Sequence, residues 1–143
     1  MATPDLDTLY CQFVDSLNQR RLTDLDRYLD PGVVQHAPET TVGVEAVKHT
    51  LLGWLAALPD LHLVIDDLVT DGDHLIARLV LSGTHQGPMA GLGAAWQGDL
   101  RSLAPTGQRV RVAVFDAWWA REGRCAERWL QVDRLELLRQ LHT

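Results

Sequence analysis

One carboxylate in the sequence lies on an apolar strand face, where a charged side chain is unusual unless it has a function or a partner. Asp116 stands in the middle of VAVFDAWWA, an apolar run with the alternation of a β-strand. Because strand side chains alternate between two faces, Asp116 shares a face with Val114 and Trp118. A carboxylate on an apolar face costs free energy unless it is paired or used. Two hypotheses stand: Asp116 is an acid/base residue in a pocket, or it pairs with an arginine such as Arg78 or Arg111.

Two histidines end short apolar segments. His85 ends SGTH, and its neutral imidazole could hydrogen-bond a substrate carbonyl; the alternative is that it fixes the following loop. His36 ends VVQH and either faces a pocket or has a structural role. The other histidines are predicted on exposed faces, in a turn or in the tail: His49, His62, His74 and His142.

The segment CAERWLQVD carries several polar side chains on one predicted strand face. Glu127, Trp129 and Gln131 alternate onto that face, and Asp133 is expected to cap the helix that follows. Gln131 could hydrogen-bond a substrate. Glu127 is either a second acid or the partner of an arginine. On the preceding strand Trp118 lines a cavity, lies in an interface or packs in the core.

No residue pattern predicts a bound cofactor. His36, His85 and Asp116 could in principle form a two-histidine, one-carboxylate metal site, but nothing in their spacing requires it, so no metal site is predicted. GxSxG, P-loop, dinucleotide-binding and HExxH patterns are missing from the sequence. Cys11 and Cys125 lie far apart and outside any CxxC spacing, which predicts neither a zinc site nor a disulfide framework.

The elements that must position these residues follow from periodicity. Apolar residues at helical spacing predict helices over residues 5–19, 22–29 and 44–58. From residue 61 the period becomes two, which predicts strands within 61–85, 108–122 and 125–133, with a turn at 71–73. A short amphipathic helix is expected over 134–141. The prediction is an α+β fold in which a curved antiparallel sheet wraps around three N-terminal helices.

One long loop interrupts the strands. The stretch from Gln86 to Gly107 contains five glycines and two prolines, too long for a hairpin connection. It also contains large apolar side chains, among them Met89 and Trp96, which a solvated linker would not need. We interpret residues 88–104 as a lid that contributes these two residues to a pocket; the alternative is an insertion without catalytic consequence.

Length and charge exclude several classes of function. A chain of 143 residues is about one domain, and its 46% hydrophobic and 22% charged residues are typical of a globular protein. A net charge of −6 argues against binding nucleic acid or an anionic membrane. The N-terminus does not resemble a signal peptide, and no apolar run is long enough for a membrane span. We therefore expect one cytoplasmic domain over residues 1–143.

The order of several short motifs resembles the SnoaL-like polyketide cyclases, which have the nuclear transport factor 2-like fold. The likeness extends from about residue 5 to residue 141. The chain departs from the family in the long connection between GTH-x-G and PTG. The motifs that carry the resemblance are Leu58-Pro59-Asp60, SGTHQG at 82–87, Pro105-Thr106-Gly107, Phe115-Asp116, Glu127 with Trp129, and the ending from Asp133 to Leu141.

The resemblance implies a cone-shaped α+β barrel and a cofactor-independent cyclase of the lyase or isomerase type in natural-product or antibiotic biosynthesis. Asp116 would be the acid/base, His85 a pocket residue that stabilises an enolate, and Trp129 a pocket wall. His36 matches a position that often faces the pocket. The substrate would be a small, apolar, polyketide-like molecule.

Relatives of this family commonly form dimers through the outer face of the sheet, so a homodimer is expected through the face that carries Phe115 and Trp119. Two other functions remain open. One is a cofactor-independent hydroxylase on the same scaffold, which would consume O₂. The other is a non-catalytic ligand-binding module that forms dimers.

Overall fold

The computed structural model describes residues 5–89 and 103–142. Its helices and strands follow one another in an α+β order, as the periodicity predicts. Among the described residues no helix is long and apolar enough to cross a membrane. The elements are α1 (Leu6–Asn18), the 3₁₀ helix η1 (Leu22–Arg27), β1 (Leu29–His36), β2 (Thr40–Val42), α2 (Val44–Ala57), β3 (His62–Asp71), β4 (His74–Thr84), β5 (Arg109–Arg121), β6 (Arg124–Val132) and α4 (Arg134–Leu141).

The strands form one six-stranded sheet in the order β2-β1-β6-β5-β4-β3. Strands β3 to β6 are antiparallel neighbours, as predicted. The expectation of a wholly antiparallel sheet is wrong at one place, because β1 pairs in parallel with β6. The short strand β2 was not predicted; it forms a hairpin with β1 across Ala37 and Pro38. The parallel pairing places the end of β1 beside the middle of β6.

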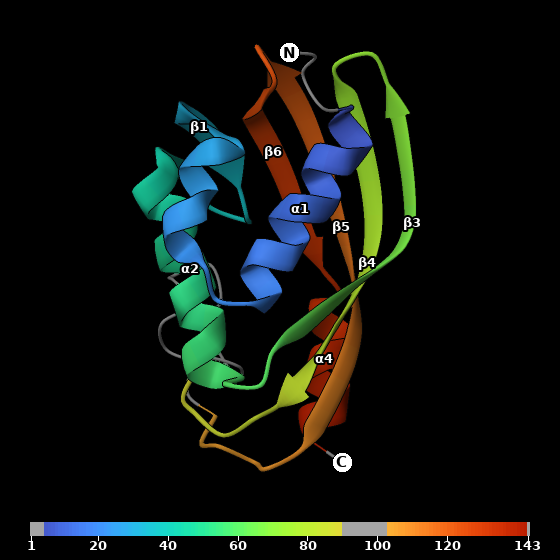
Figure 1. Cartoon of the computed structure of the whole chain (residues 1–143). Coiled ribbons are helices and arrows are strands. Elements are labelled where there is room, and N and C mark those ends of the chain that lie inside the picture. The colour runs from blue at the N-terminus through green and yellow to red at the C-terminus, as the bar shows by residue number, and fades with distance from the viewer. Residues whose placement is uncertain (1–4, 90–102, 143) are drawn as a thin grey trace.

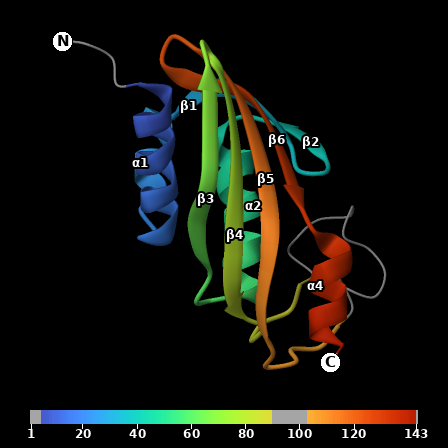
Figure 2. The same cartoon turned by 90° about the vertical axis from the view of Figure 1, so that its right-hand side faces the viewer.

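Helices α1 and α2 cover the concave face of the curved sheet, whereas the other face lies open (Figures 1 and 2). The apolar stripe of α1 is buried at Leu9, Tyr10, Phe13, Val14 and Leu17. The end of α1 is tied to β3, because the Asn18 amide donates to the Leu63 carbonyl and accepts from its N–H, each at 2.8 Å. The core therefore lies between these helices and the sheet.

Tight turns and a cap set the ends of the strands. Gly72 adopts φ 60° in the β3–β4 turn, a conformation that glycine reaches without steric cost. Asp133 caps α4 as expected, since its carboxylate accepts the Glu136 N–H at 3.1 Å. The side chain of Gln140 on α4 bonds the backbone of Arg111, which holds the helix against β5.

The long connection between β4 and β5 is anchored at both ends. The His85 N–H donates to the Gln108 carbonyl and the Gly107 N–H to the His85 carbonyl, each at 2.8 Å. The N–H groups of Gln86 and Gly87 both donate to the Ala57 carbonyl at the end of α2. Residues 90–102, and with them most of the segment interpreted as a lid, lie outside the described residues.

Candidate functional site

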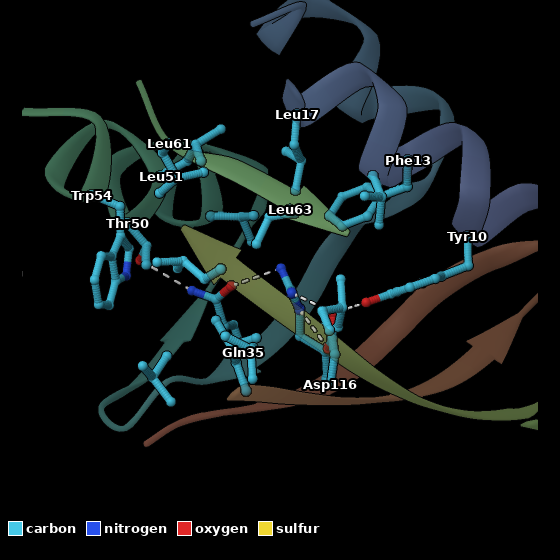
Figure 3. A pocket seen from close by; sticks show the side chains of 18 residues that line it. Tyr10, Phe13, Leu17, Gln35, Thr50, Leu51, Trp54, Leu61, Leu63 and Asp116 are labelled. Carbon is cyan, nitrogen blue, oxygen red and sulfur yellow. Dashed lines mark hydrogen bonds and ion pairs between the residues drawn. The ribbon is translucent and has the colours of Figure 1, made fainter. Parts of the chain in front are cut away.

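The described residues enclose an apolar cavity between α1, α2 and the concave face of the sheet (Figure 3). Its volume is about 620 Å³, counting the solvent at its mouth. Most of its lining is aliphatic or aromatic, and polar side chains gather at one end. The lining residues are Tyr10, Phe13, Val14, Leu17, Gln35, Val47, Thr50, Leu51, Trp54, Leu61, Leu63, Leu79, Leu81, Val114, Asp116, Arg128, Leu130 and Val132.

Asp116 lies at the polar end of this cavity and is bonded from two sides. Arg128 Nη2 donates to Asp116 Oδ2 at 2.7 Å, and Arg128 Nε reaches Oδ1 at 3.3 Å. The Tyr10 hydroxyl donates to the same Oδ2 at 2.8 Å. The pairing hypothesis is confirmed, but the partner is Arg128 and not Arg78 or Arg111. Among the described residues, Oδ1 accepts only the longer contact, so it is the carboxylate oxygen with more room for another proton donor.

The ion pair is almost completely removed from water, with the side chains of Arg128 and Asp116 only 6% and 2% exposed. Burial is the largest single effect on Arg128 and opposes its charge, but the charge and hydrogen bond of Asp116, together with Tyr10 and Cys125, outweigh burial and raise the Arg128 pKa. Burial, together with the Asp116 charge, also raises the pKa of Tyr10 well above its usual range. Tyr10 therefore stays protonated and acts as a donor to the carboxylate.

Gln35 and Thr50 extend the polar end away from the ion pair. Arg128 Nη1 donates to Gln35 Oε1 at 3.2 Å, and Gln35 Nε2 donates to Thr50 Oγ1 at 3.1 Å. The Thr50 hydroxyl in turn donates to the Ala46 carbonyl within α2 at 3.1 Å. Figure 3 shows the chain running across the floor of the cavity from Thr50 to Tyr10. Five elements thus contribute to one chain of hydrogen bonds: α1, β1, α2, β5 and β6.

His85 does not line the cavity. It is fully buried at the foot of the long loop, where its Nδ1 lies 3.1 Å from the Thr106 N–H and 3.0 Å from the Thr106 hydroxyl. Because Nδ1 accepts the backbone N–H, the neutral ring carries its proton on Nε2. Burial lowers the His85 pKa, so the ring stays neutral at pH 7. These contacts support the alternative that His85 fixes the loop.

His36, Glu127 and Trp129 are brought together, but on the face of the sheet opposite the cavity. His36 Nε2 lies 2.8 Å from Glu127 Oε2, and Nδ1 lies 2.9 Å from the Thr40 hydroxyl. The imidazole stacks on Trp129 with ring centroids 5.1 Å apart. Strand alternation explains the placement, because Arg128 and Leu130 point into the cavity and their neighbours point outward.

The other predicted site residues lie at separate places. Gln131 lines a shallow hollow outside the cavity, which shares Trp54, Leu130 and Val132 with the cavity wall. Trp118 is fully buried and packs edge-on against Tyr10 and Phe13, with centroids 5.0 and 4.9 Å apart.

Of the two loop residues, Met89 is fully buried in the core but does not line the cavity. Trp96 lies outside the described residues. His49, His62, His74 and His142 are exposed, as expected.

Sequence reasoning missed Arg128, Tyr10 and Gln35. Arg128 had a usable signal, because it alternates with Leu130 and Val132 on the apolar face of its strand, as Asp116 does on the neighbouring strand. Tyr10 and Gln35 had none, since an aromatic residue in a helix stripe and a glutamine in a short strand are common in any core. Within the described parts of the chain, no three His, Cys, Asp or Glu side chains are grouped closely enough to bind a metal ion.

A comparison with family models matches residues 7–141 to the SnoaL-like polyketide cyclases. Among solved structures, the chain is similar to TsrD from Streptomyces laurentii, with 28% identity, a TM-score of 0.81, and coverage of 99% of this chain and 97% of TsrD. A search of curated protein sequences finds no match.

Two further solved structures share the fold. One is a SnoaL-like polyketide cyclase from Agrobacterium tumefaciens, with 24% identity, a TM-score of 0.78, and 99% of each chain covered. The other is AclR, a candidate hydroxylase from Streptomyces galilaeus, with 23% identity, a TM-score of 0.77, and coverage of 99% of this chain and 83% of AclR. The two names differ in activity, so the shared fold alone does not choose between them.

Proposed function

Because the chain belongs to the SnoaL-like polyketide cyclase family, we propose that it closes a ring in an apolar, carbonyl-rich polyketide-type intermediate without a cofactor. One observation carries this proposal: among the described residues that line the apolar cavity there is a single carboxylate, Asp116, and one of its oxygens accepts only a long contact from them. A buried carboxylate beside an apolar cavity is a suitable base for a carbon acid. The apolar walls fit a substrate made mainly of carbon.

In the proposed reaction, Asp116 Oδ1 removes a proton from a carbon next to a substrate carbonyl. The resulting enolate carbon attacks a second carbonyl of the same chain, which forms the ring C–C bond and leaves an alkoxide. The proton on Asp116 then passes to the alkoxide oxygen, so the carboxylate is regenerated and no electrons are gained or lost. General acid–base help of this kind supplies about 10²–10⁴-fold in rate.

The walls of the cavity make a second contribution to the rate acceleration, because they hold the substrate in one folded shape. A flexible chain with several carbonyl groups can fold in many ways, and a pocket that accepts one of them keeps the reacting carbons close. Leucine side chains from the sheet, α1 and α2 line the cavity, among them Leu63, Leu79 and Leu81 from the sheet, Leu17 from α1 and Leu51 from α2. These side chains offer shape without hydrogen bonds, which suits the apolar middle of such a substrate.

The experiment that tests this function follows ring closure of a linear poly-β-ketone by liquid chromatography and mass spectrometry. We expect wild-type protein to raise the yield of one cyclic product and Asp116→Asn to reduce the rate by about 10²-fold or more. Folding of the variant is checked by circular dichroism. The proposal is contradicted if wild type and Asp116→Asn form the product at the same rate. It is also contradicted if wild-type protein gives no more of the product than the reaction without protein.

A hydroxylase on the same scaffold is the alternative, because AclR shares the fold. The same assay separates the two functions when it is run under ¹⁸O₂. A cyclase gives a product without the heavy isotope, and a hydroxylase incorporates it. A non-catalytic ligand-binding module would bind the poly-β-ketone and leave the product distribution unchanged.

We also propose that the protein is a homodimer. The outer face of the sheet carries five large exposed apolar side chains in adjacent strands: Val64, Val69, Ile76, Phe115 and Trp119, each at least 50% exposed. Several large apolar side chains exposed on one face are unusual on a monomer. A second copy of the chain would cover it with the same type of surface.

A further inference from the structure

We propose that Gln35 and Arg128 form an oxyanion site at the polar end of the cavity, which binds the enolate oxygen of a 1,3-dicarbonyl group. This inference rests on the proposed function and deepens it, because it names the chemical group that the site would recognise. It also assigns the enolate-stabilising role to residues other than His85, which lies at the loop foot.

The orientation of the Gln35 amide follows from its two neighbours. Arg128 can only donate, so the Gln35 atom that faces Arg128 Nη1 at 3.2 Å must be the carbonyl oxygen. The amide nitrogen then faces Thr50 Oγ1 at 3.1 Å, and the Thr50 hydroxyl is free to accept because it donates its own proton to the Ala46 carbonyl. Thr50 is thus a positioning residue for Gln35. The second N–H of the Gln35 amide has no acceptor among the described residues.

Arg128 presents donors in the same region. Its hydrogen bonds to Asp116 and Gln35 use Nε, Nη1 and Nη2 once each. Each of the two terminal nitrogens carries a second hydrogen, which none of these bonds to described residues uses. The guanidinium carbon lies 5.4 Å from the centre of the Phe13 ring, so one face of the group packs against an aromatic side chain. The remaining N–H groups are left for a ligand in the cavity.

The polar end of the cavity therefore presents both hydrogen-bond donors and an acceptor. Gln35 and Arg128 offer N–H donors, and Asp116 beside them offers an acceptor oxygen. A 1,3-dicarbonyl group matches both, since its acidic C–H is next to two carbonyl oxygens. Donors that are already oriented in a buried site stabilise developing negative charge more than solvent does. When Asp116 takes up the proton its carboxylate becomes neutral, so the positive charge of Arg128 then compensates the enolate that forms.

The test uses benzoylacetone, a small apolar 1,3-diketone whose enol and enolate have different ultraviolet spectra. Titrating it with base in the presence of excess protein gives the apparent pKa of the bound diketone. We expect wild-type protein to bind the enolate about tenfold more tightly than the neutral form, which lowers that pKa by about one unit. No turnover is needed for this measurement.

Gln35→Glu is the decisive variant, because it keeps the shape and the bond to Arg128 but replaces the N–H donor with an acceptor. We expect the preference for the enolate to be lost or reversed in Gln35→Glu. Thr50→Val should weaken the preference by a few-fold, since the Gln35 amide loses the acceptor that orients it. The matched control is Gln131→Glu, which makes the same change of charge in the hollow outside the cavity and should leave the preference unchanged.

The outcomes separate this inference from the proposed function. An enolate preference that is the same in Gln35→Glu and wild type overturns the oxyanion site, even if Asp116→Asn abolishes ring closure. If the preference is lost in Gln35→Glu but Asp116→Asn closes rings normally, the oxyanion site stands and the role of Asp116 falls. Wild-type protein that binds neither form of the diketone overturns the oxyanion site, and the ring-closure assay then decides the proposed function by itself.

Discussion

At the scale of single residues, the buried ion pair dominates both stability and chemistry. A carboxylate and a guanidinium taken out of water each cost several kcal/mol of solvation, and only good geometry offsets this. Arg128 reaches Asp116 through two nitrogens, and Tyr10 adds a third donor. The donors that hold the charge of Asp116 are therefore the same groups that form the polar end of the cavity.

Arg128→Met is expected to lower the free energy of unfolding by about 3–5 kcal/mol, because it leaves the Asp116 carboxylate buried and unpaired. Urea denaturation followed by circular dichroism measures the change. The control is Arg78→Met, which breaks an exposed pair with Asp66 at 3.0 Å and should change stability by about 1 kcal/mol or less. A similar small change for both variants would show that the buried pair contributes little.

His85 gives the protein a specific sensitivity to acid. Burial lowers its pKa in the folded state below the ordinary value near 6.5, so the unfolded chain binds the proton more readily. The contribution of His85 to the free energy of unfolding is therefore fully present above pH 6.5. It is lost as the pH falls below that value towards the folded-state pKa.

His85→Asn tests this linkage, because an asparagine oxygen can still accept the Thr106 N–H but does not titrate. The free energy of unfolding, measured by urea denaturation between pH 7.5 and 5.5, should fall less steeply in the variant than in wild type. His49→Asn, a change at an exposed histidine on α2, is the control for the loss of a histidine outside the buried loop foot. Equal slopes in wild type and His85→Asn would contradict the account.

The sequence allowed the site to be predicted only where one residue conflicts with its surroundings. Asp116 on an apolar strand face is such a conflict, and the structure confirms that it is buried and paired with an arginine. The positions of Glu127 and Trp129 relative to the cavity depend on which face of the sheet α1 and α2 cover, and alternation alone does not contain that information. Gln35 acquires its chemical role from Thr50 and Arg128, which come from distant parts of the chain.

At the scale of elements, the foot of the long loop is fixed on the end of α2. The N–H groups of Gln86 and Gly87 share the Ala57 carbonyl, and His85 bonds both Thr106 and Gln108. The end of β4 is also tied to Asp60, whose carboxylate accepts the Thr84 N–H at 2.6 Å and the Thr84 hydroxyl at 2.8 Å. Helix α2, which contributes Thr50 to the cavity, is thereby held against the sheet.

Gly87→Ala is expected to destabilise the protein strongly, because an added Cβ would lie 1.8 Å from the Ala56 carbonyl oxygen. Overpacking against backbone costs about 1–3 kcal/mol or more, since the helix end itself must move. Thermal unfolding measures the loss. Gly32→Ala is the control, with its nearest contact at 3.5 Å. A Gly87→Ala protein as stable as wild type would mean that the loop foot is not packed on α2.

The elements with strong periodicity were predictable from the sequence. Helices α1 and α2, the β3–β4 hairpin and β5 lie where apolar spacing places them, within a few residues. The parallel pairing of β1 with β6 was not, because it joins segments about ninety positions apart, such as His36 and Trp129, and local pattern does not specify a distant partner. The hairpin of β1 with β2 could not be predicted, because β2 has only three residues and their sequence shows no clear alternation of apolar and polar side chains.

At the scale of the whole molecule, the two faces of the sheet have different roles. The concave face carries the cavity under α1 and α2, and the outer face is uncovered in Figure 2. On the outer face an aromatic row runs from His74 through Trp119 to Trp129 and His36, with neighbouring ring centroids 4.9–5.2 Å apart. Apolar and aromatic surface of this extent suits contact with a second protein chain.

Light scattering at micromolar concentration is expected to give about twice the chain mass of 16.0 kDa. Trp119→Glu, which puts a charge on the half-exposed outer face, should shift the protein towards the monomer. Leu135→Glu is the control, because Leu135 is 79% exposed and lies on α4 and not on the strands that carry that face. A wild-type mass of one chain would exclude the proposed dimer.

The central claim is that Asp116 moves a proton to and from a carbon in the cavity. It is tested most directly by the exchange of α-protons of 2-tetralone, an apolar ketone, in D₂O, followed by nuclear magnetic resonance. We expect wild-type protein to accelerate exchange, Asp116→Asn to lose about 10²-fold or more of that acceleration, and Asp66→Asn on the outer face to retain it. Exchange at the wild-type rate in folded Asp116→Asn, or no acceleration by wild-type protein, would contradict the claim.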